Sequence, residues 1–396
     1  MRHLWRRISK NVRLLGFVSF FNDIASEMLY PIIPIFLTAV LGAPAFIVGL
    51  IEGVAEAAAN ILKFFTGLWS DRLRRRKRFL VIGYGSAAFA KLLLSTAYSW
   101  VIVLLARLTD RFGKGIRTAP RDALIADSSQ KRFLGVSFGF HRALDTAGAV
   151  VGPLLALLFI TIFKENYRLL FLFAVIPSVI GLFLLIPVKE LRPKKAKTTV
   201  DFRQFATLGK ELKFFLLISF IFALGNSSDV FIILKAKSIG FSLAMVIIFY
   251  ASFNLVYAIF STPAGAFADK MGKGLTITIG FFLFALVYLG FAYATASIWV
   301  MFAFYGLYMA LTEGVGKAYI SELAPKELRG TVLGIFAGLT GIATLLASVT
   351  AGLLWSYVAP QAAFFLGSTM ALIAGLLMIY LLIRHKHRDT KPSAEV

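Results

Sequence analysis

Charged residues that could bind or move a proton lie inside stretches of this sequence that are otherwise apolar. The stretch from 100 to 126 carries Arg107, Asp110, Arg111 and Lys114 at positions i, i+3, i+4 and i+7. On an α-helix these four side chains would share one face. Cations and carboxylates placed together change the local charge balance when a proton is gained or lost. We therefore expect this face to bind a proton or a polar solute and to point away from lipid.

Other apolar stretches supply further polar and ionisable groups, most of them in the first half of the chain. They are Asn22, Asp23, Glu27, Glu52, Glu56, His141 and Asp145 in the first half, and Asn226, Asp229, Glu313 and Lys317 in the second. An ionisable group within a membrane is costly and is a functional candidate by default, although each could instead form a structural ion pair. We expect protonation in the first half, and we expect Arg117 and Arg121 to be interfacial anchors.

The elements that must position these groups are membrane-spanning helices. Of 396 residues 59% are hydrophobic, and the mean hydropathy is +0.80, well above an ordinary soluble domain. A spanning helix needs roughly 20 mostly apolar residues, whereas barrel strands are shorter and alternate. The sequence predicts an all-α polytopic membrane protein with about twelve spans: 13–39, 46–70, 78–98, 100–126, 134–163, 167–188, 213–236, 242–268, 275–296, 299–324, 330–358 and 361–384.

The formal charge of +22 is concentrated in alternate connectors between these stretches. This is the positive-inside pattern, which predicts an inner-membrane protein with both termini and the 189–213 segment in the cytoplasm. We expect contact with the lipid bilayer and no nucleic-acid binding. The chain has no cysteine, which excludes disulfides and thiolate metal sites, and we expect no cofactor.

The second half of the sequence repeats features of the first. Gly67 to Arg72 reads GLWSDR and Gly265 to Lys270 reads GAFADK, an offset of 198 residues, half the chain length. Duplicated helical halves are common in secondary transporters, whose solute site lies near the midplane. We predict a six-helix bundle over 1–188, an amphipathic cytoplasmic linker over 189–213, and a second six-helix bundle with a basic tail over 214–396.

The repeated motif resembles the signature of the major facilitator superfamily between its second and third helices. Gly67, Asp71 and Arg72 fit the pattern, and Gly265 and Asp269 fit it again in the second half. The resemblance implies two pseudo-symmetric six-helix halves and a conformational latch at these residues, with the glycines allowing close helix approach. Trp69 and Arg74 depart from the usual Leu and Gly.

The stretch 134–163 resembles the antiporter motif of the drug-efflux branches of that superfamily. Gly139, Gly148, Gly152 and Pro153 match its spacing; small residues permit tight helix contact and proline removes a backbone hydrogen bond. A looser match places Arg111, or Arg107 one turn earlier, at an arginine that the family associates with proton transfer. The resemblance implies export.

Together these features predict a proton-coupled antiporter that exports a small solute by alternating access. Asp23, Glu27 and Asp110 are the expected proton acceptors, and we expect a monomer. Alternatives on the same fold are a uniporter, an exporter of organic anions held by Arg107, Arg111 and Lys114, and an exporter of divalent metal held by Asp23, Glu27 and Asp229. A membrane enzyme is disfavoured because no nucleophile and base stand at a fixed spacing. A membrane sensor is disfavoured because the residues outside the predicted helices form only short loops and a tail, not a soluble domain.

Overall fold

The computed structural model describes residues 8–73, 75–130, 134–190, 208–295, 297–325 and 329–389, and this part of the chain contains helices and no strand. Within it, ten helical segments are long and apolar enough to cross a membrane. The all-α membrane fold predicted from the sequence is confirmed. The side chains of Gly67, Asp71 and Arg72, and most of the predicted linker, lie outside the described residues.

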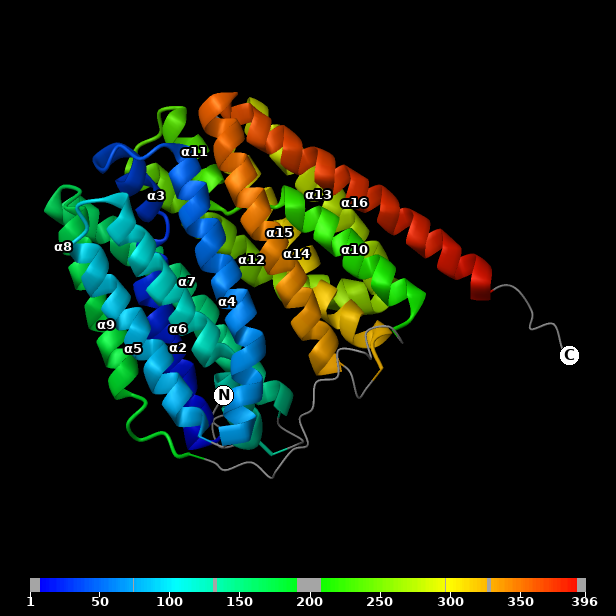
Figure 1. Ribbon diagram of the computed structural model, residues 1–396, viewed down its shortest axis with the longest axis horizontal. Coiled ribbons are helices and arrows are strands. Elements are labelled where there is room, and N and C mark those ends of the chain that lie inside the picture. The colour runs from blue at the N-terminus through cyan, green and yellow to red at the C-terminus, as the bar shows by residue number, and fades with distance from the viewer. Residues whose placement is uncertain are drawn as a thin grey trace, which may run out of the picture. The chain divides into compact units, whose positions relative to one another are not determined.

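The chain divides into two compact units, whose helices are labelled in Figure 1. Unit 1 comprises Met1–Thr199 and Asp229–Asn254. Its helices are α2 (Lys10–Leu29), α3 (Ile33–Ile35), the π-helical turn η1 (Phe36–Val40), α4 (Ala45–Leu73), α5 (Arg76–Ser95), α6 (Trp100–Asp127), α7 (Leu134–Phe163), α8 (Tyr167–Phe173), α9 (Val175–Phe183), α11 (Val230–Ser238) and the first part of α12 (Leu243–Met271).

Unit 2 comprises Val200–Ser228 and Leu255–Val396. It contains α10 (Lys210–Gly225), the rest of α12, α13 (Lys273–Tyr293), α14 (Ile298–Leu323), α15 (Arg329–Tyr357) and α16 (Pro360–Asp389). Its interior is aromatic: the rings of Phe284 and Tyr288 stack with centroids 3.9 Å apart, and both residues are fully buried. Such rings contribute large buried apolar area.

The predicted spans agree with these helices. Two of the predicted spans are not among the ten long apolar segments. The span 100–126 corresponds to α6, which carries many charged residues, and the span 167–188 corresponds to the short helices α8 and α9. The span predicted at 213–236 is interrupted between α10 and α11. The predicted domain boundaries stay a prediction, and the structure groups residues 229–254 with unit 1.

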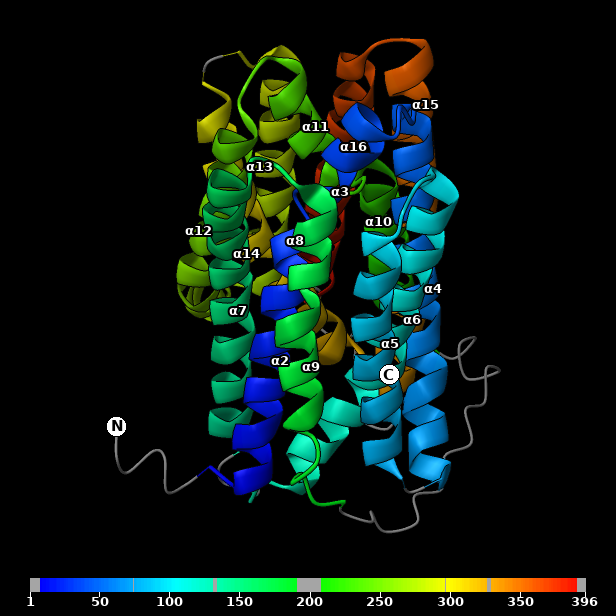
Figure 2. The ribbon, with the colours of Figure 1, turned by 90° about the vertical axis from the view of Figure 1, so that its left-hand side faces the viewer.

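Within unit 1, α2 packs against α7 and α9, and α6 packs against α4 and α5, as Figure 2 shows. The approach of α2 and α7 depends on glycine: a Cβ built on Gly148 would lie 2.6 Å from the carbonyl oxygen of Phe20, and one on Gly152 would lie 2.7 Å from that of Ile24. A Cβ on Gly139 would meet nothing within 4 Å. Two of the three motif glycines therefore permit tight helix contact, with Pro153 directly after them inside α7.

The predicted cytoplasmic end of unit 1 is joined by hydrogen bonds between segments distant in sequence. The buried Asn11 amide donates to the carbonyl of Lys189 at 2.9 Å and to Ser128 Oγ at 3.2 Å, and the Lys189 amide donates back at 3.0 Å. The Glu190 carboxylate accepts from the first two backbone amides of α5. Acidic groups at a helix N-terminus are stabilising.

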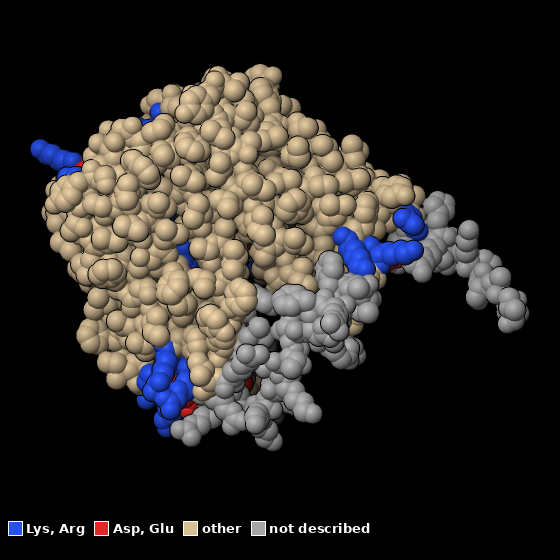
Figure 3. Space-filling model, in the orientation of Figure 1, with Lys and Arg blue, Asp and Glu red and all other residues tan. Residues whose placement is uncertain are grey.

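Charged side chains on the face shown in Figure 3 gather at the ends of helices, and the wide surface between them is almost free of charge. Lipid can solvate such an apolar surface, whereas charged side chains need water or headgroups. This distribution fits the membrane-spanning assignment.

Candidate functional site

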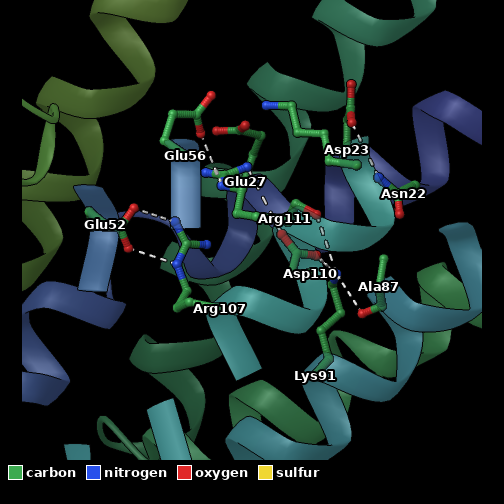
Figure 4. A network of polar contacts seen from close by, with 12 residues as sticks. Asn22, Asp23, Glu27, Glu52, Glu56, Ala87, Lys91, Arg107, Asp110 and Arg111 are labelled. Carbon is green, nitrogen blue, oxygen red and sulfur yellow. Dashed lines mark hydrogen bonds and ion pairs between the residues drawn. The ribbon is translucent and has the colours of Figure 1, made fainter. Parts of the chain in front are cut away.

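The centre of the polar network in unit 1 is a buried ion pair between Arg107 on α6 and Glu52 on α4 (Figure 4). Arg107 Nε donates to Glu52 Oε1 at 2.7 Å and Nη2 donates to Oε2 at 2.5 Å. Both side chains are about 5% exposed or less. A bidentate pair of this kind is geometrically specific, and it leaves the Arg107 charge compensated by protein.

Asp110 and Arg111 continue the network toward α5. Arg111 Nε lies 3.2 Å from a Glu56 oxygen, and its Nη1 lies 4.0 Å from Asp110. The other oxygen of Asp110 lies 3.4 Å from Lys91 Nζ, which also donates to the carbonyl of Ala87 at 3.1 Å. The Asp110 carboxylate is thus compensated by cations on two helices (Figure 4).

Lys91 was missed by the sequence reasoning. It is 2% exposed and also donates to Ser26 Oγ at 3.3 Å. The signal was present, because a lysine stands in the middle of the apolar stretch 78–98, and an ionisable group at such a position should be treated as a functional candidate.

Asp23 and Glu27 on α2 differ from Glu52, Glu56 and Asp110. Both are half-buried, and among the described residues no Lys, Arg or His nitrogen lies within 4 Å of either carboxylate. Asp23 accepts a hydrogen bond from Asn22 Nδ2 at 3.4 Å. Glu27 accepts one from the Tyr250 hydroxyl at 2.5 Å. Both carboxyl groups are therefore hydrogen-bonded by neutral groups, with no cation beside them among the described residues.

Tyr250 joins this site from the first part of α12, which belongs to unit 1. Its ring stacks on Tyr30 with centroids 5.4 Å apart, and the Arg107 guanidinium lies 5.6 Å from the centroid of Tyr30. The aromatic pair therefore connects Glu27 to the buried ion pair through successive contacts. No sequence signal marked it, because tyrosines in apolar helices are common.

A second polar cluster joins α2, α5, α6 and α7. Ser19 Oγ lies 2.8 Å from His141 Nε2 and 3.1 Å from the Tyr84 hydroxyl, and it accepts from Arg121 Nη1 at 3.2 Å. Arg121 Nη1 also lies 3.9 Å from Asp145 Oδ1. His141 thus contacts Ser19, and Asp145 faces arginine.

The expectation that Arg117 and Arg121 are interfacial anchors is wrong. Arg117 is 5% exposed, and its guanidinium lies 4.7 Å from the centroid of Tyr84 and donates to the Gly83 carbonyl at 3.4 Å. The Arg121 side chain is 15% exposed. Both point into unit 1 because they continue the charged face of α6, which packs against α5.

The remaining candidates lie on α6, at the start of α11 and in unit 2. Lys114 is half-buried on α6, and Asp229 directly precedes α11 in unit 1. In unit 2, Asn226 donates to the Tyr308 hydroxyl at 3.0 Å, and Glu313 accepts from Tyr257 at 3.0 Å. The described residues include no group of three potential ligands that could hold a metal ion, so Asp23, Glu27 and Asp229 do not form one.

The second copy of the predicted latch is exposed. Asp269 is paired with Lys273 at 3.5 Å and its side chain is 76% exposed. A Cβ on Gly265 would meet nothing within 4 Å, so close helix contact does not require glycine there.

Comparison with known proteins decides the family. The model of the Major Facilitator Superfamily matches residues 15–235 and 215–396. The chain belongs to the major facilitator superfamily. It is 42% identical over 388 residues to an uncharacterized MFS-type transporter of Methanocaldococcus jannaschii, covering 95% of this chain and 96% of that protein. This transporter is therefore a multi-pass membrane protein that acts on small-molecule substrates, and the family and its relatives are transporters, not enzymes.

More distant similarities define what is shared. The crystal structure of the nucleoside transporter NupG superimposes with a TM-score of 0.78 at 14% identity, covering 94% of this chain and 100% of that one. At that identity only the fold is shared. The quinolone resistance protein NorA of Staphylococcus aureus is 23% identical over 146 residues, 37% of each chain, which is weak support for a drug-efflux resemblance.

Proposed function

We propose that this transporter is a proton-coupled antiporter that exports a small polar solute by alternating access. The observation that carries the proposal is the difference between two sets of carboxylates in unit 1. Glu52, Glu56 and Asp110 are paired with cations, whereas Asp23 and Glu27 have none within 4 Å among the described residues.

The cost of protonation separates these two sets. Adding a proton to Glu52 or Asp110 would leave a buried arginine or lysine without its counter-charge, which is strongly unfavourable. Adding a proton to Asp23 or Glu27 breaks no ion pair, and both groups are partly exposed. Of the three acceptors expected from the sequence, Asp23 and Glu27 are therefore favoured over Asp110.

The difference between paired and unpaired carboxylates also indicates which class of solute could bind. Arg107 and Arg111 are already paired with Glu52 and Glu56, so an organic anion would have to displace a carboxylate to reach them. Asp23 and Glu27 favour a solute that carries a positive charge and competes with protons for the same groups. Exchange of this kind is antiport.

Export and orientation rest on separate arguments. The tight packing of Gly148 and Gly152 against α2 matches the antiporter motif, which favours export. The similarity to a quinolone resistance protein also favours export. The positive-inside pattern places both termini in the cytoplasm, and the bacterial and archaeal relatives support a location in the plasma membrane.

Proton flux in proteoliposomes tests this proposal. Vesicles that contain a pH-sensitive dye would receive lipophilic cations, organic anions and divalent metals one at a time, and we expect flux on addition of a cation. Asp23→Asn with Glu27→Gln should abolish that flux. Glu165→Gln, an exposed carboxylate between α7 and α8, is the control and should retain it. Transport that persists undiminished and without pH dependence in the double variant would refute the proposal.

A further inference from the structure

Asp23 on α2 lies against Asp145 on α7. Gly148 stands three residues after Asp145, and a Cβ built on Gly148 would lie only 3.0 Å from Asp23 Cβ. Residues three apart on a helix share a face, so the Asp145 carboxyl group lies beside that of Asp23 at this contact. The contact is fixed by the packing of α2 against α7, which glycine makes close.

The two carboxyl groups have unequal surroundings. Asp145 Oδ2 lies 3.6 Å from Arg142 Nη1, and Oδ1 lies 3.9 Å from Arg121 Nη1. That Oδ1 atom is buried and accepts no hydrogen bond in the described part of the chain. Asp23 has no cation within 4 Å among the described residues. Asp145 is therefore an ionised carboxylate with one oxygen that lacks a hydrogen-bond donor, whereas Asp23 is a carboxyl group that lacks a neighbouring cation in the described part of the chain.

We infer that Asp23 and Asp145 hold one proton between them, with Asp23 as the protonated partner. Two ionised carboxylates cannot hydrogen-bond to each other, whereas one proton supplies both the missing donor and the charge balance. Arginine on two sides keeps Asp145 ionised, so its oxygen accepts the bond from Asp23. The role of this proton in exchange rests on the proposed function, but its presence does not.

Several charged and titratable groups surround the pair. Glu27 on α2, Arg117 and Arg121 on α6, and His141 and Arg142 on α7 act on the two carboxyl groups. Tyr84 on α5 contacts Ser19, and Asp122 on α6 contacts Arg121, beside the pair. Helix α9 also packs against α2 and contributes no titratable residue.

Infrared spectroscopy of the purified full-length protein in lipid nanodiscs at neutral pH tests this inference. We expect a protonated carboxylic-acid carbonyl band that shifts when the protein contains isotopically labelled aspartate. The band should be lost in Asp23→Asn. It should also be lost in Asp145→Asn, because an amide at 145 can donate to an ionised Asp23. It should remain in Glu27→Gln, the matched control on the same helix.

A wild-type spectrum without an aspartic-acid band, or a band that survives in Asp23→Asn, would overturn the shared proton. Isotope labelling of the wild-type protein gives an answer even where a variant fails to fold. Because the spectrum is recorded without solute or gradient, it is independent of transport. If the band is missing, the inference is overturned even where the flux assay shows proton coupling. If the band is present but the flux assay shows no proton coupling, the shared proton is supported and the proposed function is refuted.

Discussion

Replacing the members of the Glu52–Arg107 pair singly and together should separate structural from functional charge in this transporter. The perturbation is a double-mutant cycle of Glu52→Leu, Arg107→Met and the combined variant. The pair is bidentate, with donor–acceptor distances of 2.5 and 2.7 Å, and almost fully buried. Each single variant leaves one charge buried without its partner, whereas the combined variant leaves none.

The expected magnitudes follow from this burial. Removing one partner of a buried pair costs about 3–5 kcal/mol, whereas replacing both by apolar residues is often close to neutral. For a unit of about 200 residues, such a single loss corresponds to a fall in Tm on the order of 10 °C. The coupling energy between the two substitutions should therefore be at least about 3 kcal/mol.

The assay is thermal unfolding of each purified variant in one detergent, followed by tryptophan fluorescence. The matched control is the pair Lys273 and Asp269, whose side chains are 25% and 76% exposed. With each replaced by Ala, the coupling should be below about 1 kcal/mol. If the losses from Glu52→Leu and Arg107→Met simply add, with coupling below about 1 kcal/mol, the two residues do not stabilise each other and the structural interpretation is refuted.

Two further predictions concern helix packing and the predicted cytoplasmic end of unit 1. Gly148→Ala should destabilise the protein by about 1–3 kcal/mol, because the added methyl would lie 2.6 Å from the Phe20 carbonyl oxygen. Gly139→Ala adds its methyl to open space and should change the stability by no more than about 0.5 kcal/mol. Equal Tm values for the two variants would contradict this prediction. Asn11→Ala removes three hydrogen bonds to Lys189 and Ser128 and should lower the free energy of unfolding by about 1.5–4 kcal/mol. An unchanged Tm together with unchanged protease sensitivity near residue 190 would show that these bonds do not stabilise the fold.

The sequence was sufficient to predict the all-α membrane fold, the approximate helix bounds and the superfamily. These properties are local: hydrophobic length, alternating basic connectors and short glycine-containing motifs can each be read from neighbouring residues. The charged face of α6 was also predictable, because Arg107, Asp110 and Arg111 follow helical spacing. The packing of Gly148 and Gly152 against α2 agreed with the motif, but that of Gly139 did not.

Only the tertiary structure decided which charges are cancelled. Arg107 and Glu52 are 55 residues apart in the chain, and Tyr250 and Glu27 are 223 apart, so neither partner could be read from spacing. The same holds for Arg117 and Arg121, whose positions near a predicted helix end suggested an interface but whose helix face is buried. Ion pairing depends on the rotation and packing of helices around one another. The sequence therefore determined which ionisable groups enter the membrane, and the fold determined that Asp23 and Glu27 have no cation within 4 Å in the described part of the chain.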